Sequence, residues 1–442
     1  MNPLATELNA VLAETVAGRL LSCFGQRMYF PKGIVVQSAE AGRRAKRFNA
    51  TAGMACENGQ PMILPAVREL TPGFSPAESV AYAPAGGDPE IRGLWKQEIL
   101  AKNPSLKDRD FSLPIVVPGL TCGVAAAADM FVNPGDTLIM PDLYWDNYEL
   151  IFADAKQAKC VFFSFFGADG RFNCAAFKEA LQKNSAAGKL VILLNFPNNP
   201  TGYSPTRAEA QEIARIVKDC AEGGADILVI SDDAYYGLFY DEETETQSLF
   251  AYFASLHERV LAIKVDGNTK EDFVWGFRVA FLSFGGRGLA ASHYEALLTK
   301  TNAVLRASIS NCSRIAQSIM IRAMKRQGYH AEKAAKLDIL KKRYLAVRKI
   351  LAARKTGKAL RELPFNSGYF MSFRCHGLSS DKLRERLLEK GIGAISLQDR
   401  LLRVAYQSID EPGLEEMFAE IFATADELLI DLSETRPGSS QL

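Results

Sequence analysis

Side chains that could do chemistry follow three successive apolar runs in the middle of the chain. They are an amide, a carboxylate, a phenol, an amine and a guanidinium: Asn199, Asp232, Tyr235, Lys270 and Arg278. Upstream of them, the loop 118–123 (PGLTCG) opens an alanine-rich helix, and the free N–H groups at such a helix start bind anions. Each fragment is ambiguous alone, because Asn, Pro and Gly favour turns and most lysines lie on the surface. Their order and spacing together predict one site.

Seven apolar runs must position these side chains. They are 113–117, 137–141, 160–165, 189–196, 226–232, 259–265 and 278–284. The runs are rich in Val, Ile, Leu and Phe without alternation, as in strands that are buried on both faces of a mainly parallel sheet. Amphipathic helices such as 206–220 lie between several of them, which predicts a doubly wound α/β domain. Ligands bind beyond the C-terminal ends of such strands.

The C-terminal part predicts a smaller α+β domain. From about residue 321 long charged helices follow, and then candidate strands at 368–374 and 400–406 with a helix near 380–390 between them. The predicted fold class is thus α/β, with a large domain built on a seven-stranded sheet flanked by helices. The predicted limits are 1–77 for an N-terminal arm and part of the small domain, 78–325 for the large domain, 326–434 for the C-terminal small domain and 435–442 for a disordered tail.

Composition argues against several classes of function. The 442 residues include 52 Lys or Arg and 51 Asp or Glu, and a net charge of +1 does not suit a nucleic-acid binder. No apolar run reaches the roughly 18 residues that span a bilayer. Glu7 and Glu14 argue against a secretory signal in the opening segment, where Leu4, Leu8 and Val11 predict an amphipathic helix. The eight scattered cysteines predict reduced thiols in the cytoplasm, without a metal site.

The motifs taken in order resemble one family. NNPTG, then D-x-A-Y, then T-K followed by G-x-R, are similar to the class I/II aminotransferases, which use pyridoxal 5'-phosphate (PLP) on fold type I. The arginine of G-x-R comes eight residues after the lysine. The resemblance extends from about Tyr82 to Arg403 and implies that this chain binds PLP.

The resemblance implies a role for each residue around the cofactor ring. Lys270 is the amine that forms the Schiff base, and it is preferred over Lys264, which lies inside an apolar run without the downstream G-x-R. Asp232 would keep the pyridine nitrogen protonated, whereas its neighbour Asp233 would face the opposite way. Tyr235 and Asn199 would hydrogen-bond the phenolic oxygen; for Tyr235, core packing is the alternative.

The phosphate would lie at the glycine loop. By the resemblance, Leu120, Thr121 and Cys122 contact it, and Arg278 neutralises its charge. The chain departs from the common pattern three residues before the lysine, where Gly267 stands in place of a frequent serine. One hydroxyl contact to the phosphate is therefore expected to be missing or replaced.

Two aromatic residues complete the implied cofactor site. The W-x-N-Y spacing after the run 137–141 nominates Trp145 as the ring that stacks on the cofactor, with Tyr144 as the competing choice. Tyr82 matches a tyrosine that comes from the neighbouring subunit and touches the phosphate. If this holds, the chain forms a homodimer with shared active sites.

Substrate recognition is implied at three positions. Arg403 resembles the small-domain arginine that holds the substrate α-carboxylate as a two-pronged salt bridge, and Gly53 falls where the backbone lies over that carboxylate. Arg306 matches the R-x-x-x-S-N spacing of aspartate aminotransferases, in which this arginine selects a side-chain carboxylate. A structural or interface role for Arg306 is equally open, because Cys312 and Ser313 stand where that subgroup often has prolines.

The predicted function is a PLP-dependent amino-acid aminotransferase with a ping-pong cycle and 2-oxoglutarate as the acceptor, aspartate-type if Arg306 selects a dicarboxylate. The main alternative is another PLP reaction on the same fold, such as a carbon–sulfur β-lyase or a ring-forming synthase, because cofactor motifs do not separate these. A non-catalytic PLP-binding regulator is disfavoured, since no winged-helix module is recognisable before Asn49. The substrates would be amino acids and 2-oxo acids, with no nucleic acid or membrane partner.

Overall fold

The computed structural model describes most of the chain from residue 34 onward. The described residues are 2–3, 6–7, 10, 34–51, 55–58, 60–62, 65–66, 73–74, 76–79, 81–84, 86–354 and 359–434. Most of the predicted opening helix, Gly53 and the predicted tail 435–442 lie outside them. The chain divides into two compact units, and each is considered by itself.

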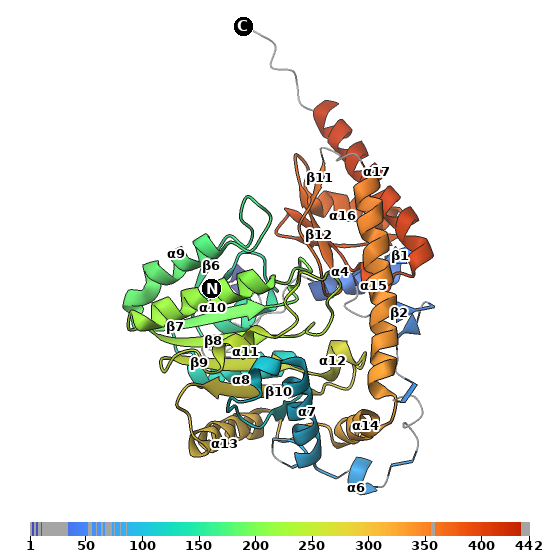
Figure 1. Cartoon of the computed structure of the whole chain (residues 1–442). Coiled ribbons are helices and arrows are strands. Elements are labelled where there is room, and N and C mark those ends of the chain that lie inside the picture. The colour runs from blue at the N-terminus through green and yellow to red at the C-terminus, as the bar shows by residue number, and fades with distance from the viewer. Residues whose placement is uncertain are drawn as a thin grey trace. The chain divides into compact units, whose positions relative to one another are not determined.

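The first unit is built on a seven-stranded sheet (Figure 1). Its strands are β4 (Ile115–Val117), β5 (Thr137–Pro141), β6 (Lys159–Phe163), β7 (Lys189–Asn195), β8 (Asp226–Asp232), β9 (Val260–Asp266) and β10 (Ala280–Gly286). Each corresponds to one predicted apolar run. In the order β4-β10-β9-β8-β7-β5-β6, only β10 runs antiparallel to its neighbours. The predicted mainly parallel α/β sheet is confirmed.

Helices cover both faces of this sheet. They are α7 (Pro89–Lys102), α8 (Leu120–Phe131), α9 (Cys174–Asn184), α10 (Arg207–Glu222), α11 (Leu249–Phe253), α12 (Asn268–Glu271), α13 (Ala291–Ser308) and α14 (Arg314–Lys325), with the short α6 (Pro76–Ser79) before them. Figure 1 shows α9 and α10 on the side of the sheet away from α8 and α13. The core on the α8 side contains every second residue of the strands, for example Leu228 and Ile230 of β8.

Helix α10 shows how local sequence sets these elements. Thr206 caps its start: the backbone N–H of Glu209 donates to the threonine hydroxyl, and the glutamate carboxylate accepts from the backbone N–H of Thr206. Its inner stripe, which includes Ala210, Ile213 and Val217, is buried. The predicted amphipathic helix 206–220 is therefore present and runs two residues further.

The second unit contains a four-stranded antiparallel sheet in the order β11-β12-β15-β14. Its elements are α4 (Ile34–Arg44), β1 (Phe48–Asn49), β2 (Cys56–Glu57), β3 (Gln60–Pro61), most of α15 (Tyr329–Ala353), β11 (Leu360–Glu362), β12 (Met371–Cys375), α16 (Ser380–Glu389), β13 (Ile392–Gly393), β14 (Ile395–Leu397), β15 (Leu401–Val404) and α17 (Glu411–Glu434). The predicted strands 368–374 and 400–406 correspond to β12 and β15. The sequence did not reveal β11 and β14, because three residues are too few to show a pattern.

The chain passes between the two units within α15. Unit 1 comprises Met1–Phe30, Ile63–Asn199 and Ser204–Lys333, and unit 2 comprises Pro31–Met62, Pro200–Tyr203 and Ala334–Leu442. The first turn of α15 belongs to unit 1, and there Lys333 forms ion pairs with Glu271 and Asp272 while Tyr329 donates to Asp272 at 2.7 Å. The domain limits predicted from the sequence stay a prediction.

The described part of the chain has no membrane-spanning helix, no metal-binding cluster and no disulfide bond. No helix there has the length and apolar character that a membrane crossing needs. No group of His, Cys, Asp and Glu side chains there could hold a metal ion. The cysteines that the structure describes are free thiols.

Candidate active site

The predicted chemical residues of unit 1 come together at one edge of the large sheet. Strand β8 ends at Asp232, and α12, which carries Lys270, directly follows the parallel strand β9. Arg278 precedes its strand instead of following it. It still reaches the same edge, because β10 is antiparallel and therefore begins where β9 ends.

Asp232 is a buried residue that accepts hydrogen bonds from three neighbours. The hydroxyl of Tyr148 donates to its Oδ2 at 2.5 Å, and the backbone N–H of Ala234 donates to its Oδ1 at 3.2 Å. The side chain of Asn195 donates to its backbone carbonyl at 2.8 Å. Burial raises the pKa of Asp232 to about 6, although the Tyr148 hydrogen bond and the charge of Lys270 oppose this rise. The carboxylate is therefore ionised at neutral pH but weakly solvated.

Strand alternation separates Asp232 from the neighbouring charged residues. Lys264, Asp233 and Asp266 form a fully buried ion-pair cluster, in which Ser248 also donates to Asp233 at 2.5 Å. These side chains lie on the face opposite to Ile263, which packs on the α8 side. The Lys264 amine is thus bound by two carboxylates.

Lys270 combines partial burial with nearby charges. Its Nζ lies 5.3 Å from the centre of the Tyr235 ring. The pKa of Lys270 is lowered to about 8. Burial is the main cause, the negative charge of Asp232 opposes it, and the positive charge of Arg278 adds to it. An appreciable fraction of the amine is thus neutral near physiological pH, as a nucleophile or base requires.

The start of α8 forms a cradle of anion-binding groups with Arg278. Gly119 precedes the helix with a φ of 86°, and a Cβ there would lie 2.2 Å from Nη2 of Arg278. Only glycine lets the guanidinium come this close to the helix N-terminus, where Leu120, Thr121 and Cys122 form the first turn. Burial raises the pKa of the Cys122 thiol to about 11, so the thiol is neutral and can donate.

Gly267 stands where a serine is frequent in the motif, and the reason is steric. A Cβ at this position would lie 2.5 Å from Cα of Ala280, on the adjacent strand β10. A serine would collide with that backbone. The close approach of β10 therefore explains why glycine, and not a residue with a hydroxyl, occupies this position.

Two aromatic neighbours, Tyr144 and Trp145, point to different surroundings. The Trp145 ring packs edge-on against Tyr148 with centroids 5.5 Å apart, and so lies beside the hydrogen-bonded partner of Asp232. Tyr144 stacks on Phe162 at 5.1 Å, and its hydroxyl donates to Glu149. Trp145, and not Tyr144, therefore lies next to Tyr148, the residue that donates to Asp232.

Two residues at this edge were missed by the sequence reasoning. Asn195, at the end of β7, donates to Asp232 and accepts from the backbone N–H of Asn199 at 2.8 Å. Tyr148 is the hydroxyl donor to Asp232. The signal was present, because Tyr148 lies three residues after Trp145 and so one helical turn away.

Tyr82 and Arg306 belong to a second group on unit 1. Tyr82 is 88% exposed. The side chain of Asn311 donates to the carbonyl of the adjacent Ala83 at 2.8 Å, while Arg306 donates to Ser310 at 2.9 Å within its own R-x-x-x-S-N motif. Arg306 is exposed on the last turn of α13. Its side chain thus bonds to its own motif, and Asn311 of that motif joins it to the segment that carries Tyr82.

Arg403 belongs to unit 2. It is buried on β15, with its guanidinium carbon 4.3 Å from the centre of the Phe370 ring, and its Nη2 donates to the carbonyl of Thr51 at 3.4 Å. Thr51 comes two residues before Gly53, which lies outside the described residues. The buried guanidinium of Arg403 is thus held close to Thr51.

Comparisons with known proteins agree on one family. The family described as aminotransferase class I and II matches residues 78–421. An aspartate aminotransferase of Pinus pinaster is 27% identical over 292 residues, which cover 66% of this chain and 54% of that protein. One of Pyrococcus horikoshii is 26% identical over 347 residues, which cover 76% and 81%. The chain thus spans about half the length of the pine relative it matches.

Solved structures share the fold. An aminotransferase from Anaerococcus prevotii superposes with a TM-score of 0.80 at 22% identity, covering 90% of this chain and 98% of that one. An aspartate aminotransferase from Thermus thermophilus, solved with maleate, has a TM-score of 0.70 at 20% identity, covering 92% and 99%. At these identities the likeness establishes the fold alone.

Proposed function

We propose a reaction and a cofactor for this chain, which belongs to the class I and II aminotransferase family. The chain is a PLP-dependent aminotransferase that passes the amino group of an amino acid to a 2-oxo acid, with 2-oxoglutarate as the acceptor. The cycle is ping-pong, so the first product leaves before the second substrate binds. The carrying observation is that Lys270, with its pKa lowered to about 8, lies within electrostatic reach of Asp232 and Arg278 at one sheet edge.

The residues at this edge fit the functional groups of PLP. The phosphate dianion suits the cradle, where glycine at position 119 admits the guanidinium of Arg278 beside the N-terminus of α8. A protonated pyridine nitrogen suits the buried carboxylate of Asp232, which lacks a cationic partner of its own among the ion pairs of the described residues. The aldehyde suits the amine of Lys270.

When bound, PLP supplies an aldehyde carbon that combines with amines and a ring that withdraws electrons from the substrate α-carbon. Asp232 holds a proton at the pyridine nitrogen, and the hydrogen bond from Tyr148 keeps Asp232 itself ionised. The neutral amine of Lys270 takes a proton from the substrate α-carbon. Trp145 would stack on the ring, while Tyr235 and Asn199 would hydrogen-bond the phenolic oxygen, as in the family pattern.

Substrate recognition is proposed at Arg403 and Gly53 for the α-carboxylate, and at Arg306 for a side-chain carboxylate. The planar guanidinium of Arg403 is held between Phe370 and the carbonyl of Thr51, which supports an orienting role. For Arg306, the exposure and the contacts within its own motif leave an interface role as the alternative.

The assembly is proposed to be a homodimer in the cytoplasm. The aromatic ring of Tyr82 is almost fully exposed on unit 1, which supports a contact with a second subunit, whose cofactor phosphate it would reach. The free thiols of the described cysteines support a reducing compartment.

Covalent trapping tests the proposal. We expect the purified protein with PLP to absorb visible light, and borohydride to attach the reduced cofactor to the tryptic peptide that carries Lys270. Lys270→Ala should lose both signals while keeping its thermal denaturation midpoint. Attachment at Lys264, or a colourless protein in excess PLP, would refute the assignment.

A panel of amino donors tests the reaction and its specificity. With 2-oxoglutarate as acceptor, glutamate formation supports transamination, whereas pyruvate released from cystathionine without an acceptor supports the β-lyase alternative. Arg306→Ala should slow aspartate far more than leucine if Arg306 binds a side-chain carboxylate. Equal losses for both donors would assign Arg306 to structure or interface.

A further inference from the structure

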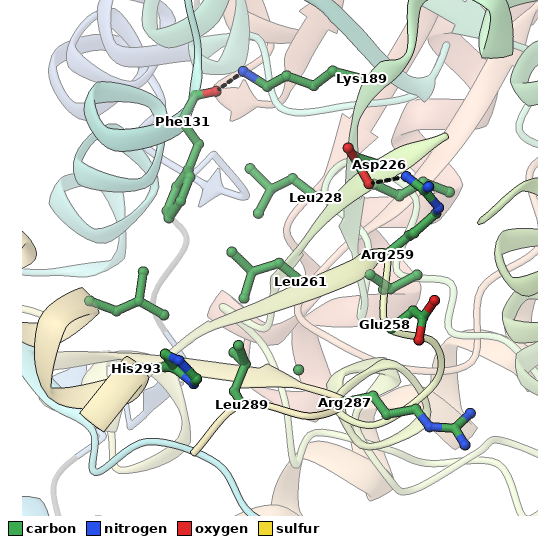
Figure 2. Close-up of a pocket in the computed structure, with 14 residues that line it drawn as sticks. Phe131, Lys189, Asp226, Leu228, Glu258, Arg259, Leu261, Arg287, Leu289 and His293 are labelled. Atoms are coloured by element: carbon green, nitrogen blue, oxygen red, sulfur yellow. Dashed lines mark hydrogen bonds and ion pairs between the residues drawn. The ribbon is translucent and has the colours of Figure 1, made fainter. Parts of the chain in front are cut away.

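A cavity lies at the other edge of the large sheet, away from the candidate active site (Figure 2). Its volume is about 510 Å³, within the range of small-molecule sites. Its wall includes Asp226 and Leu228 at the start of β8, whereas Asp232 ends the same strand. Six residue steps along an extended strand span about 20 Å. The cavity is therefore separate from the proposed reaction site.

The interior of the cavity is apolar. Leu228 and Leu261 face it from adjacent strands, on the side of the sheet that packs against α8 and α13. The end of α8 contributes Phe131, and Leu289 and Leu297 close the cavity from the segment after β10. These side chains suit a large hydrophobic group, whose burial supplies most of the binding free energy in such sites.

Three of the five charged groups at the rim, Lys189, Arg259 and Asp226, are already engaged. Lys189 donates to the carbonyl of Phe131 at 2.6 Å and to the carboxylate of Asp136 at 2.5 Å. Arg259 pairs with Asp226 at 2.9 Å. Figure 2 shows the contact of Lys189 with Phe131 above Leu228 and Leu261, and the Arg259–Asp226 pair to their right. The charges of these groups are therefore already balanced within the protein.

The other two charged groups, Glu258 and Arg287, are exposed and have no ion pair or hydrogen bond within the described part of the chain. Glu258 precedes β9 and Arg287 follows β10, at the same sheet edge, because Leu261 and Gly286 pair across these antiparallel strands. Figure 2 shows both on one side of the cavity. An anion and a cation beside an apolar space match a zwitterion that carries a hydrophobic group.

We propose that this cavity binds a free amino acid with a large apolar side chain. Its carboxylate pairs with Arg287, its ammonium group pairs with Glu258, and its side chain enters the space among Leu228, Leu261 and Leu289. This ligand site lies outside the reaction site and needs no PLP. The charge pair selects an amino acid over an apolar acid or an apolar amine.

Photolabelling of the full-length protein tests this site. The probe is p-benzoyl-L-phenylalanine, whose benzophenone attaches to nearby C–H bonds on irradiation, and the labelled peptides are identified by mass spectrometry. We expect label on peptides that contain residues 258–261 or 286–297. L-phenylalanine should prevent it, whereas 3-phenylpropanoate and phenethylamine, which each lack one charge, should need at least about tenfold higher concentration.

Variants locate the contacts. Arg287→Gln and Glu258→Gln should each raise the probe concentration for half-maximal labelling about tenfold, and Leu289→Trp should abolish labelling by filling the cavity. Arg171→Gln, a change at another exposed arginine of unit 1, should leave it unchanged. The proposal would be overturned if 3-phenylpropanoate competed as well as L-phenylalanine. It would also be overturned if the label appeared only elsewhere in the chain, or if Leu289→Trp left the labelling unchanged. All these variants should keep the wild-type denaturation midpoint, except for a small shift in Leu289→Trp.

Discussion

At the scale of single residues, the proposed active site depends on a buried acid and a partly buried base with shifted pKa values. Burial raises the pKa of Asp232 to about 6 and lowers that of Lys270 to about 8. Between these values Asp232 is ionised, and Lys270 begins to lose its proton. A neutral amine and a charged carboxylate can then coexist near physiological pH, which is the combination that the proposed chemistry requires.

Removing the Tyr148 hydroxyl should weaken this arrangement. Without that donor the pKa of Asp232 should rise, so Tyr148→Phe should lower kcat at pH 7 by about tenfold and move the acid limb of the kcat–pH profile to higher pH. Tyr144→Phe is the matched control, because its hydroxyl bonds Glu149 instead. Identical profiles for the two variants would contradict the role of Tyr148.

Asp232 should also reduce the stability of the cofactor-free protein. Its pKa is about 6 when folded against an ordinary value of 3.8, so the folded state binds the extra proton and stability falls as the pH rises through this window. Asp232→Asn should therefore stabilise the apoprotein at pH 8 by about 3 kcal/mol, less any loss of the Tyr148 hydrogen bond. Urea denaturation should show this gain shrinking from pH 6 to pH 4; a constant gain would refute the explanation.

At the scale of elements, the short helix α12 is fixed to its surroundings by the residues next to Lys270. Glu271 forms ion pairs with Lys102 of α7 and Lys333 of α15, and Asp272 pairs with Lys333 at 2.7 Å. These cations lower the pKa of Glu271, against the effect of burial. A four-residue helix has little stability of its own, so these pairs set the position of the amine.

Lys333→Met should therefore disturb α12. The substitution removes a positive charge that pairs with the buried carboxylates of Glu271 and Asp272. We expect the free energy of unfolding to fall by about 3–5 kcal/mol at pH 7. Because the pKa of Glu271 is lowered in the folded state, the pairs stabilise above its ordinary value of 4.5, and this stability declines as the pH falls below it. Denaturation at pH 7 and pH 4 should show a smaller deficit in acid.

Lys342→Met is the control for this prediction. Lys342 pairs with Asp338 within α15 at 2.9 Å, but both side chains are more than half exposed. We expect no measurable change in its unfolding free energy. A comparable loss in both variants would mean that the helix, and not the contacts to α12, is responsible.

At the scale of the whole molecule, the proposed shared active site can be tested by mixing two defective chains. Tyr82→Ala and Lys270→Ala should each impair the enzyme when alone. If Tyr82 acts across the dimer, half of a randomly mixed population contains one intact site, so activity should return to about a quarter of wild type. If the mixture is no more active than the two separate variants, Tyr82 acts in the site of its own subunit or in no site.

Much of this architecture was predictable from the sequence. The seven apolar runs became the seven strands, because a strand buried on both faces needs a continuous apolar segment that is visible in the chain. The roles of Asn199, Asp232 and Lys270 came from the resemblance to family motifs and stay proposals. The parallel strands explain why these residues lie at one edge, because they bring their C-terminal ends together there. The family match agrees with that interpretation.

Other features depended on contacts between segments that are distant in the chain. The direction of β10 decides that Arg278 joins the site and that Arg287 lies at the opposite edge. The same strand excludes a side chain at Gly267, and packing puts Trp145 against Tyr148 but Tyr144 against Phe162. Composition and local periodicity determine which segments form strands and helices. Strand direction, close approach and burial arise only when the segments pack, because each depends on atoms contributed by another part of the chain.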